Sequence, residues 1–197
     1  MANDGTGTTP GFIAVGGATS FTFSVTGTIS LNSGGNTNDA DGHNAAPGTS
    51  SNTGANGISG IIAPGAGYLV GVFLAPGGPS GPAPASLDFT TGSGTAFTSL
   101  APLLDQVFFI GDGRTGDGTG ATQVFNVPTG ATQLYFGISD ACGYNGAPSC
   151  YSDNSGSFDV TASGVGGSPV PEPSSLILLG TGALGVAGAV RRRLQAA

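Results

Sequence analysis

The chain has 197 residues, of which 38 are Gly and 13 are Pro, a content typical of low-complexity disorder or of a turn-rich fold. A hydrophobic content of 38% argues against disorder, and the glycines follow no three-residue period, which excludes collagen. Residues 1–190 contain all eleven acidic residues and one basic residue, Arg114, so phosphate backbones would be repelled and nucleic-acid binding is excluded.

Short apolar or alternating segments predict an all-β body. In Phe21–Leu31 the odd positions are mostly apolar and the even positions are all Ser or Thr, as in a strand with one buried face and one solvated face. Tyr68–Leu74 is apolar on both faces, which is typical of a central strand. Further strands are predicted at Phe12–Val15, Gln106–Ile110, Gln123–Val127, Gln133–Ile138 and Ser157–Thr161, and Leu100–Leu104 is either a short strand or a helical turn. Seven or eight such strands predict an antiparallel β-sandwich.

Three connections between these strands are long and polar. Residues 32–56 are rich in Gly and Asn and are predicted as a loop without internal pattern, and residues 75–86 form a Pro-rich connection. Gly111–Gly118 carries Asp112 and Asp117, as a calcium loop would. It lacks an acid at the twelfth position and has no flanking helix, so a glycine-rich hairpin loop is favoured over an ion site.

Oxygen-bearing side chains are predicted to meet where two strands end. Asp140 follows the strand Gln133–Ile138, and Asp153 and Asn154 precede the strand that begins at Ser157. Calcium takes six to eight oxygen ligands from carboxylates, amides and loop carbonyl groups, so this pattern is compatible with a calcium site. An Asx-rich turn that caps a strand fits the same residues.

The same stretch, ending in Asp-Asn-Ser-Gly-Ser-Phe at residues 153–158, resembles the calcium-dependent galactophilic lectins of bacteria, which are small jelly-roll-like β-sandwiches. The resemblance spans about residues 18–162. The calcium ligands that it implies are the side chains of Asp140, Asp153 and Asn154 and the main-chain carbonyl groups of Cys150 and Leu31.

The lectin resemblance also implies a sugar contact made by a His together with the calcium ligands, for which the candidates are His43, Asp140 and Asp153. The sequence departs from the lectin pattern in three ways. The loop between Asp140 and Asp153 is longer, Asp replaces one Asn, and no Gln lies near His43.

The chain contains two cysteines, Cys142 and Cys150, and both lie in that longer loop. An even number of cysteines in an exported protein favours a disulfide, and bridging so short a loop would contribute about 2–3 kcal/mol. The spacing is unsuitable for a zinc pair, and the single His cannot complete a four-ligand zinc site.

The C-terminus consists of three consecutive segments. A Pro-Glu-Pro triplet is followed by the uncharged segment Leu176–Val190 and then by three arginines. A membrane-spanning helix needs about 20 apolar residues, with a lower limit near 17, and counting from Ser174 gives 17. Flanking arginines stay in the cytoplasm, so the body would lie outside the membrane. A buried helix of a soluble protein is disfavoured, because a helix apolar on all sides has no place on a small sandwich.

This order of segments resembles the PEP-CTERM sorting signal of Gram-negative bacteria. The resemblance implies an exported protein that is held in the inner membrane by its tail until an exosortase recognises and processes it. The first twelve residues show neither the basic nor the apolar segment of a secretory signal peptide, so either translation starts elsewhere or the leader has been removed. The residues that carry the motif are Pro171, Glu172, Pro173, Arg191, Arg192 and Arg193.

The predicted fold is therefore an all-β, antiparallel, jelly-roll-like sandwich with a single C-terminal hydrophobic helix. The predicted organisation is an extracellular β-sandwich at residues 1–165, a linker with the Pro-Glu-Pro motif at 166–175, a transmembrane sorting helix at 176–190 and a basic cytoplasmic tail at 191–197.

The predicted function is that of an exported surface or extracellular-matrix protein with a structural or adhesive role and a calcium-stabilised body. A calcium-dependent, galactose-type lectin is the alternative. The expected partners are an exosortase-type protease and the lipid bilayer, with extracellular polysaccharide as a further candidate. Enzymatic activity is not expected, because the chain has one His, no Lys, and a single Glu that lies in the sorting motif.

Overall fold

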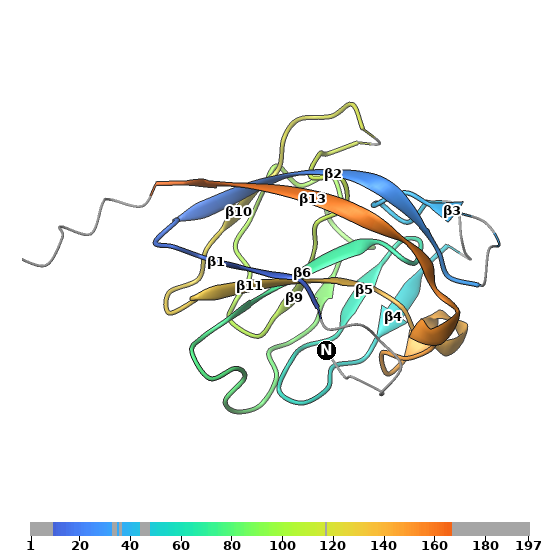
Figure 1. Cartoon of the computed structure of the whole chain (residues 1–197). Helices are drawn as coiled ribbons and strands as arrows, with labels where there is room; N and C mark the ends of the chain where they lie inside the picture. Colours follow the sequence, from blue (N-terminus) through green and yellow to red (C-terminus); the bar gives the residue numbers. More distant parts are fainter. Residues whose placement is uncertain (1–9, 33–34, 36, 44–47, 117, 167–197) are drawn as a thin grey trace, which may run out of the picture. The chain divides into compact units, whose positions relative to one another are not determined.

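Strands make up most of the regular structure in this computed structural model, which describes residues 10–32, 35, 37–43, 48–116 and 118–166 (Figure 1). The helical elements of that part of the chain are two 3₁₀-helices, η1 (Cys142–Tyr144) and η2 (Tyr151–Asp153). The chain divides into two units, Met1–Gly166 and Gly167–Ala197, and the described residues all belong to the first. No helix of the described residues is long and apolar enough to cross a membrane, and the helix predicted at 176–190 lies outside them.

The first sheet has the strand order β1–β11–β6–β9 and is antiparallel throughout. The central strand β6 is buried at all six positions, as the apolar character of both of its faces predicts. The strands of this sheet are β1 (Phe12–Ala14), β6 (Leu69–Leu74), β9 (Val107–Phe109) and β11 (Gln133–Ile138).

The second sheet has the order β13–β2–β10–β8, and β3 pairs with the end of β2. Strands β2 and β13 run antiparallel side by side, with a register that extends from Ser20 opposite Val165 to Ser30 opposite Ser155 (Figure 1). The strands of this sheet are β2 (Ser20–Ser30), β3 (Thr37–Asn38), β8 (Ser99–Leu100), β10 (Val124–Asn126) and β13 (Ser155–Val165).

Phenylalanine side chains join these two sheets. The ring of Phe21 on β2 lies 6.4 Å from that of Phe73 on β6, and the ring of Phe125 on β10 lies 5.5 Å from that of Phe108 on β9. Because each pair takes one ring from each sheet, the two sheets share one hydrophobic core, and Phe21, Phe23 and Val25 of β2 contribute to it as predicted. Ile29, near the end of β2, belongs to a second, smaller cluster with Leu31 and Ala66.

A third sheet, with the order β12–β4–β5–β7, was not predicted from the sequence. Its pairs β12–β4 and β5–β7 are parallel, as is β10–β8 in the second sheet, so the prediction of a wholly antiparallel sandwich is wrong for these pairs. Parallel neighbours need long connections, which the extended loops of this chain provide. The strands are β4 (Ser50–Asn52), β5 (Ile61–Ala63), β7 (Leu87–Asp88) and β12 (Asn145–Gly146).

The segment 32–56 is not a patternless loop where the structure describes it, because it contains β3 and β4. Its polar residues Asn38, Asp41 and Asn52 are buried. Burial of polar groups requires hydrogen bonds, and Asn52 Nδ2 donates one to the main-chain carbonyl oxygen of Asp140 at 2.8 Å. These contacts with distant parts of the chain order a segment that lacks apolar periodicity.

The remaining connections follow the prediction in part. Residues 75–86 contain no strand, as predicted. Of the two alternatives at Leu100–Leu104, the short strand is found in part, because β8 ends at Leu100 and a turn follows at 104–105. The prediction of a hairpin loop after β9 is wrong, because β9 belongs to the first sheet and β10 to the second.

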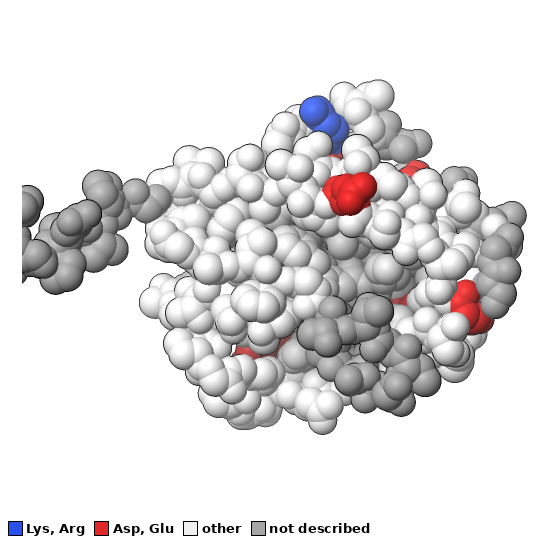
Figure 2. Space-filling model, in the orientation of Figure 1, with Lys and Arg blue, Asp and Glu red and all other residues white. Residues whose placement is uncertain are grey.

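The surface has few charges, and Figure 2 shows isolated charged groups separated by wide uncharged areas.

Candidate metal sites

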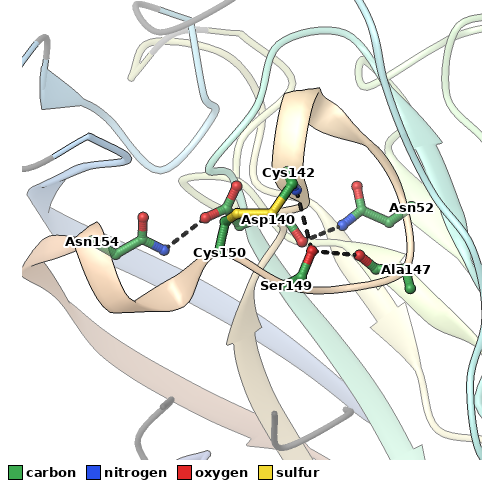
Figure 3. Close-up of a disulfide and its surroundings, with 7 residues drawn as sticks. All are labelled: Asn52, Asp140, Cys142, Ala147, Ser149, Cys150 and Asn154. Atoms are coloured by element: carbon green, nitrogen blue, oxygen red, sulfur yellow. Dashed lines mark hydrogen bonds between the residues drawn. A yellow bond between two sulfur atoms is a disulfide. The ribbon is translucent and has the colours of Figure 1, made fainter.

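The chain between β11 and β13 forms a loop closed by a disulfide (Figure 3). Cys142 and Cys150 are joined as predicted, and their Cα atoms lie 5.3 Å apart, within the usual range for a disulfide. Ser149 Oγ accepts a hydrogen bond from the Cys142 N–H at 3.2 Å and donates one to the Ala147 carbonyl oxygen at 3.0 Å. This small ring restricts the loop that separates Asp140 from η2.

Asp140 lies two residues beyond β11 and is 4% exposed. Its Oδ2 atom accepts a hydrogen bond from Asn154 Nδ2 at 2.9 Å, and Asn52 lies on its other side in Figure 3. Burial raises the pKa of Asp140 to about 6. Hydrogen bonds from Asn154 and from the Ala141 N–H lower this pKa, and the nearby Asp153 carboxylate raises it. The negative charge of Asp140 is therefore disfavoured in the folded protein unless a cation compensates it.

Two side-chain oxygens of residues near Asp140 lack hydrogen-bond donors within the described part of the chain. Oδ1 of Asp153 and Oδ1 of Asn154 are shielded from solvent and have no hydrogen-bond partner within the described part of the chain. A buried acceptor without a partner costs on the order of 1–3 kcal/mol, so such atoms require an explanation, and a cation bound by them is one. The structure thus brings Asp140 and Asn154 into contact and places Asp153 close enough to affect the Asp140 pKa.

The two predicted carbonyl ligands are attached to the same region. Leu31 follows the last residue of β2, Ser30, which pairs with Ser155 on β13, so Leu31 lies opposite Asn154 if the ladder is extended by one residue. Cys150 immediately precedes η2 and has a left-handed backbone conformation, with φ at 63°. Main-chain segments that carry both carbonyl groups therefore border the loop that holds Asp153 and Asn154.

A second group of ionisable side chains lies after β3. Ligand atoms of Asp39, Asp41 and His43 lie within 4.8 Å of one another. Asp39 Oδ1 accepts hydrogen bonds from main-chain N–H groups of this loop, including that of Asp41 at 3.1 Å, and Asp39 Oδ2 is 3.5 Å from His43 Nδ1. The described residues contain no cluster of such ligands that joins His43 to Asp140 and Asp153.

Asp41 is the most perturbed member of this second group. It is 8% exposed, and its Oδ1 atom accepts a hydrogen bond from the Asp112 N–H at 3.1 Å. Burial raises the pKa of Asp41 to about 7, with further raising by the carboxylates of Asp112 and Asp39 and lowering by the Asp112 hydrogen bond and by His43. The alternating acids of Asp39-Ala40-Asp41-Gly42-His43 were the available signal for this group in the sequence.

Asp112 holds the glycine-rich loop after β9 in place. Its carboxylate oxygens accept hydrogen bonds from the N–H groups of Arg114 and Gly118, each at 2.7 Å. Asp117, the second acid of that loop, lies outside the described residues. The Asp112 carboxylate therefore serves the loop's own main chain, as expected for a turn.

One segment of the chain matches a known family model. Residues 169–193 match the PEP-CTERM protein-sorting motif, and this range contains the Pro-Glu-Pro triplet at 171–173 and the arginines at 191–193. The predicted motif is therefore confirmed, and it implies an exported, cell-surface-sorted protein that is processed by an exosortase. No curated protein and no solved structure matches the chain, so the resemblance of the body to galactophilic lectins is not supported.

Proposed function

We propose that the protein is a structural or adhesive component of the cell surface or extracellular matrix, and that its β-sandwich binds calcium through Asp140, Asp153 and Asn154. The sorting motif supports export and processing at the C-terminus. The observation that carries the calcium proposal is the pair of shielded, unpartnered oxygens, Oδ1 of Asp153 and Oδ1 of Asn154, beside a buried carboxyl group.

The donor set suits a hard divalent cation. Two carboxylates, those of Asp140 and Asp153, would balance the charge of calcium. The amide oxygen of Asn154 would be a neutral ligand after its amide group rotates, because in the structure Asn154 presents Nδ2 to Asp140. The carbonyl groups of Leu31 and Cys150 are further candidates. The two sulfur atoms are joined to each other, so no thiolate is available to favour a softer metal. A bound cation would stabilise the charged form of Asp140 and lower its pKa.

The position of the site favours a structural role for the ion. Asp140 follows β11 of the first sheet, whereas Asp153 and Asn154 precede β13 of the second sheet. An ion bound by all three side chains would therefore connect the two layers of the sandwich at one end. Because calcium would bind the folded chain and not the unfolded one, it would raise the stability of the body.

The role that we propose is not enzymatic. Two cavities of the described body, one between β6 and the disulfide loop and the other beside residues 54–60, are lined by no carboxylate, imidazole or thiol group. We do not extend the proposal to sugar recognition, because His43 pairs with Asp39 and joins Asp41, instead of Asp140 and Asp153.

Thermal unfolding of the full-length protein with and without calcium tests the proposal. Millimolar calcium should raise the Tm of the wild type relative to a chelator, since a ligand at about 100 times its Kd stabilises by about 2.7 kcal/mol. Asp140→Asn and Asp153→Asn should lose this rise, whereas Asp159→Asn, at an exposed site on β13, should keep it. A wild-type Tm that does not respond to calcium would refute the site, and an undiminished rise in Asp140→Asn would place calcium elsewhere.

Sorting is tested separately in cells. Mass spectrometry of the chain from a host with an exosortase should find a C-terminus upstream of Arg191, and from an exosortase-deficient strain it should find the tail intact. Glu172→Ala should reduce processing, whereas Glu172→Asp, which keeps the negative charge, should reduce it less. Identical C-termini in both strains would contradict processing at this motif.

A further inference from the structure

Strand β13 has a free edge that differs from the other sheet edges in the described residues. The edge strands β1, β7, β8, β9 and β12 have two or three residues each, whereas β13 has eleven. Short edge strands limit pairing with other chains, but a long one presents a row of unpaired N–H and C=O groups. No Pro or Lys blocks the edge of β13, and its one charged residue is Asp159.

Among the described residues, no strand pairs with the outer side of β13. Strand β13 pairs with β2 along its whole length, and none of its hydrogen bonds to the rest of the described chain lies outside the side facing β2. In an antiparallel pair, alternate residues point their N–H and C=O groups away from the neighbour, so about half of the eleven residues present both groups to the outside. Figure 1 shows β13 along the outside of the second sheet.

The side chains of β13 do not screen this edge. Those that pack against the core are Phe158, Val160 and Ala162. The alternate positions are exposed and carry small polar groups that make no hydrogen bond within the described residues, and they are Ser157, Asp159, Thr161 and Ser163. The edge is thus nearly uncharged, although the body as a whole is strongly acidic. With one carboxylate in eleven residues, this edge offers little charge repulsion to a second copy of this acidic chain.

We propose that β13 pairs antiparallel with β13 of a second copy of this chain, with the two-fold axis at Val160. In this register Asp159 faces Thr161 of the second copy, and Ser157 faces Ser163. Phe158 and Ala162 face each other on the inner side, so apolar groups meet apolar groups and hydroxyls meet polar groups. An axis at Asp159 would instead place two carboxylates directly opposite each other, which is unfavourable. The second sheets of the two copies would form one continuous sheet.

Sedimentation equilibrium of the full-length protein and two pairs of variants tests this pairing. Thr161→Asp places a carboxylate opposite Asp159 of the second copy at two symmetric positions, and Thr161→Lys places an ammonium group there. Because two cross-strand charge pairs are involved, the dimer dissociation constant of Thr161→Asp should be about 2–30-fold larger than that of Thr161→Lys. The control pair Thr22→Asp and Thr22→Lys changes an outward residue of β2, away from the edge, and should leave the dimer constant unchanged.

The outcomes of this experiment are distinct. A wild type that stays monomeric at all concentrations would overturn the proposal. A dimer that responds equally to Asp and Lys at position 161 would overturn it as well, because association through another surface, including the C-terminal segment, is insensitive to this edge. Circular dichroism of each variant checks that its overall strand content equals that of the wild type.

Discussion

Asp41→Asn should remove a large part of the pH dependence of stability when calcium is absent. Asp41 is 8% exposed, and burial raises its pKa from 3.8 to about 7. The folded state therefore binds this proton more tightly than the unfolded chain does. Between about pH 4 and pH 7 the unfolded chain loses the proton first, so the free energy of unfolding decreases as the pH rises through this window.

The magnitude follows from the two pKa values. At about 1.4 kcal/mol for each tenfold change, the ionised Asp41 reduces stability by up to about 4 kcal/mol once the pH exceeds its folded-state pKa. Asn keeps an Oδ1 acceptor for the Asp112 N–H but has no charge to bury. The variant should therefore gain about 2–4 kcal/mol relative to the wild type between about pH 4 and about pH 8. Ionisation of Asp140 also lowers the free energy of unfolding as the pH rises to about 6. It does so in the wild type and in the variant alike, so it cancels in the difference between them.

Urea unfolding in the presence of a chelator measures the free energy of unfolding of the wild type and of Asp41→Asn at about pH 4 and about pH 8. Asp159→Asn, in an exposed position on β13, is the matched control and should follow the wild type. A difference between Asp41→Asn and the wild type that stays constant with pH would refute the assignment of a raised pKa to Asp41.

Three further predictions concern the body. Cys142→Ser should lower the free energy of unfolding by about 2–3 kcal/mol and weaken calcium binding, because the disulfide no longer restricts the loop; urea unfolding that matches the wild type would contradict this. Gly71→Ala should cost about 1–3 kcal/mol, since its Cβ atom would lie 2.6 Å from a buried Phe ring, whereas Gly116→Ala, whose Cβ would meet nothing closer than 3.7 Å, should not. Equal Tm values for these two variants would be inconsistent with the packing described. Phe125→Ala should cost about 3–5 kcal/mol because Phe125 is fully buried, while Phe12→Ala, at 54% exposure, should cost much less, and chemical denaturation distinguishes the two.

The long strands could be predicted because one property of the sequence determines them. In the first part of β2 the alternation of apolar and hydroxyl residues matches the alternation of more and less buried positions, whereas Ser30 at its end is buried against the prediction. For β11 the predicted and observed bounds are the same, Gln133–Ile138. The apolar pattern of each of these segments lies within the segment itself, so local sequence is sufficient to predict it.

The third sheet could not be predicted, because its strands are only two or three residues long and one of them, β4, is entirely polar. Ser50 and Asn52 of β4 are buried through contacts with residues far along the chain, such as the hydrogen bond between Ser50 Oγ and Tyr68 Oη at 3.1 Å. No short pattern in the sequence encodes such partners.

The two candidate metal sites also differ in how far local sequence determines them. The motif around Asp153 and Asn154 is local, and these residues lie near Asp140 because one short, disulfide-closed loop joins the end of β11 to the start of β13, although the two strands belong to different sheets. Asp41 is buried and contacts Asp112, 71 residues further along the chain, so its raised pKa appears only in the folded structure.

Calorimetric titration of the full-length protein with calcium at about pH 6, where Asp140 is partly protonated, tests the proposed calcium site most directly. The account predicts saturable binding that releases protons, seen as an enthalpy that changes with the ionisation heat of the buffer, and loss of that binding in Asp140→Asn. Absence of binding in the wild type, or equal binding with the same proton release in Asp140→Asn, would contradict it.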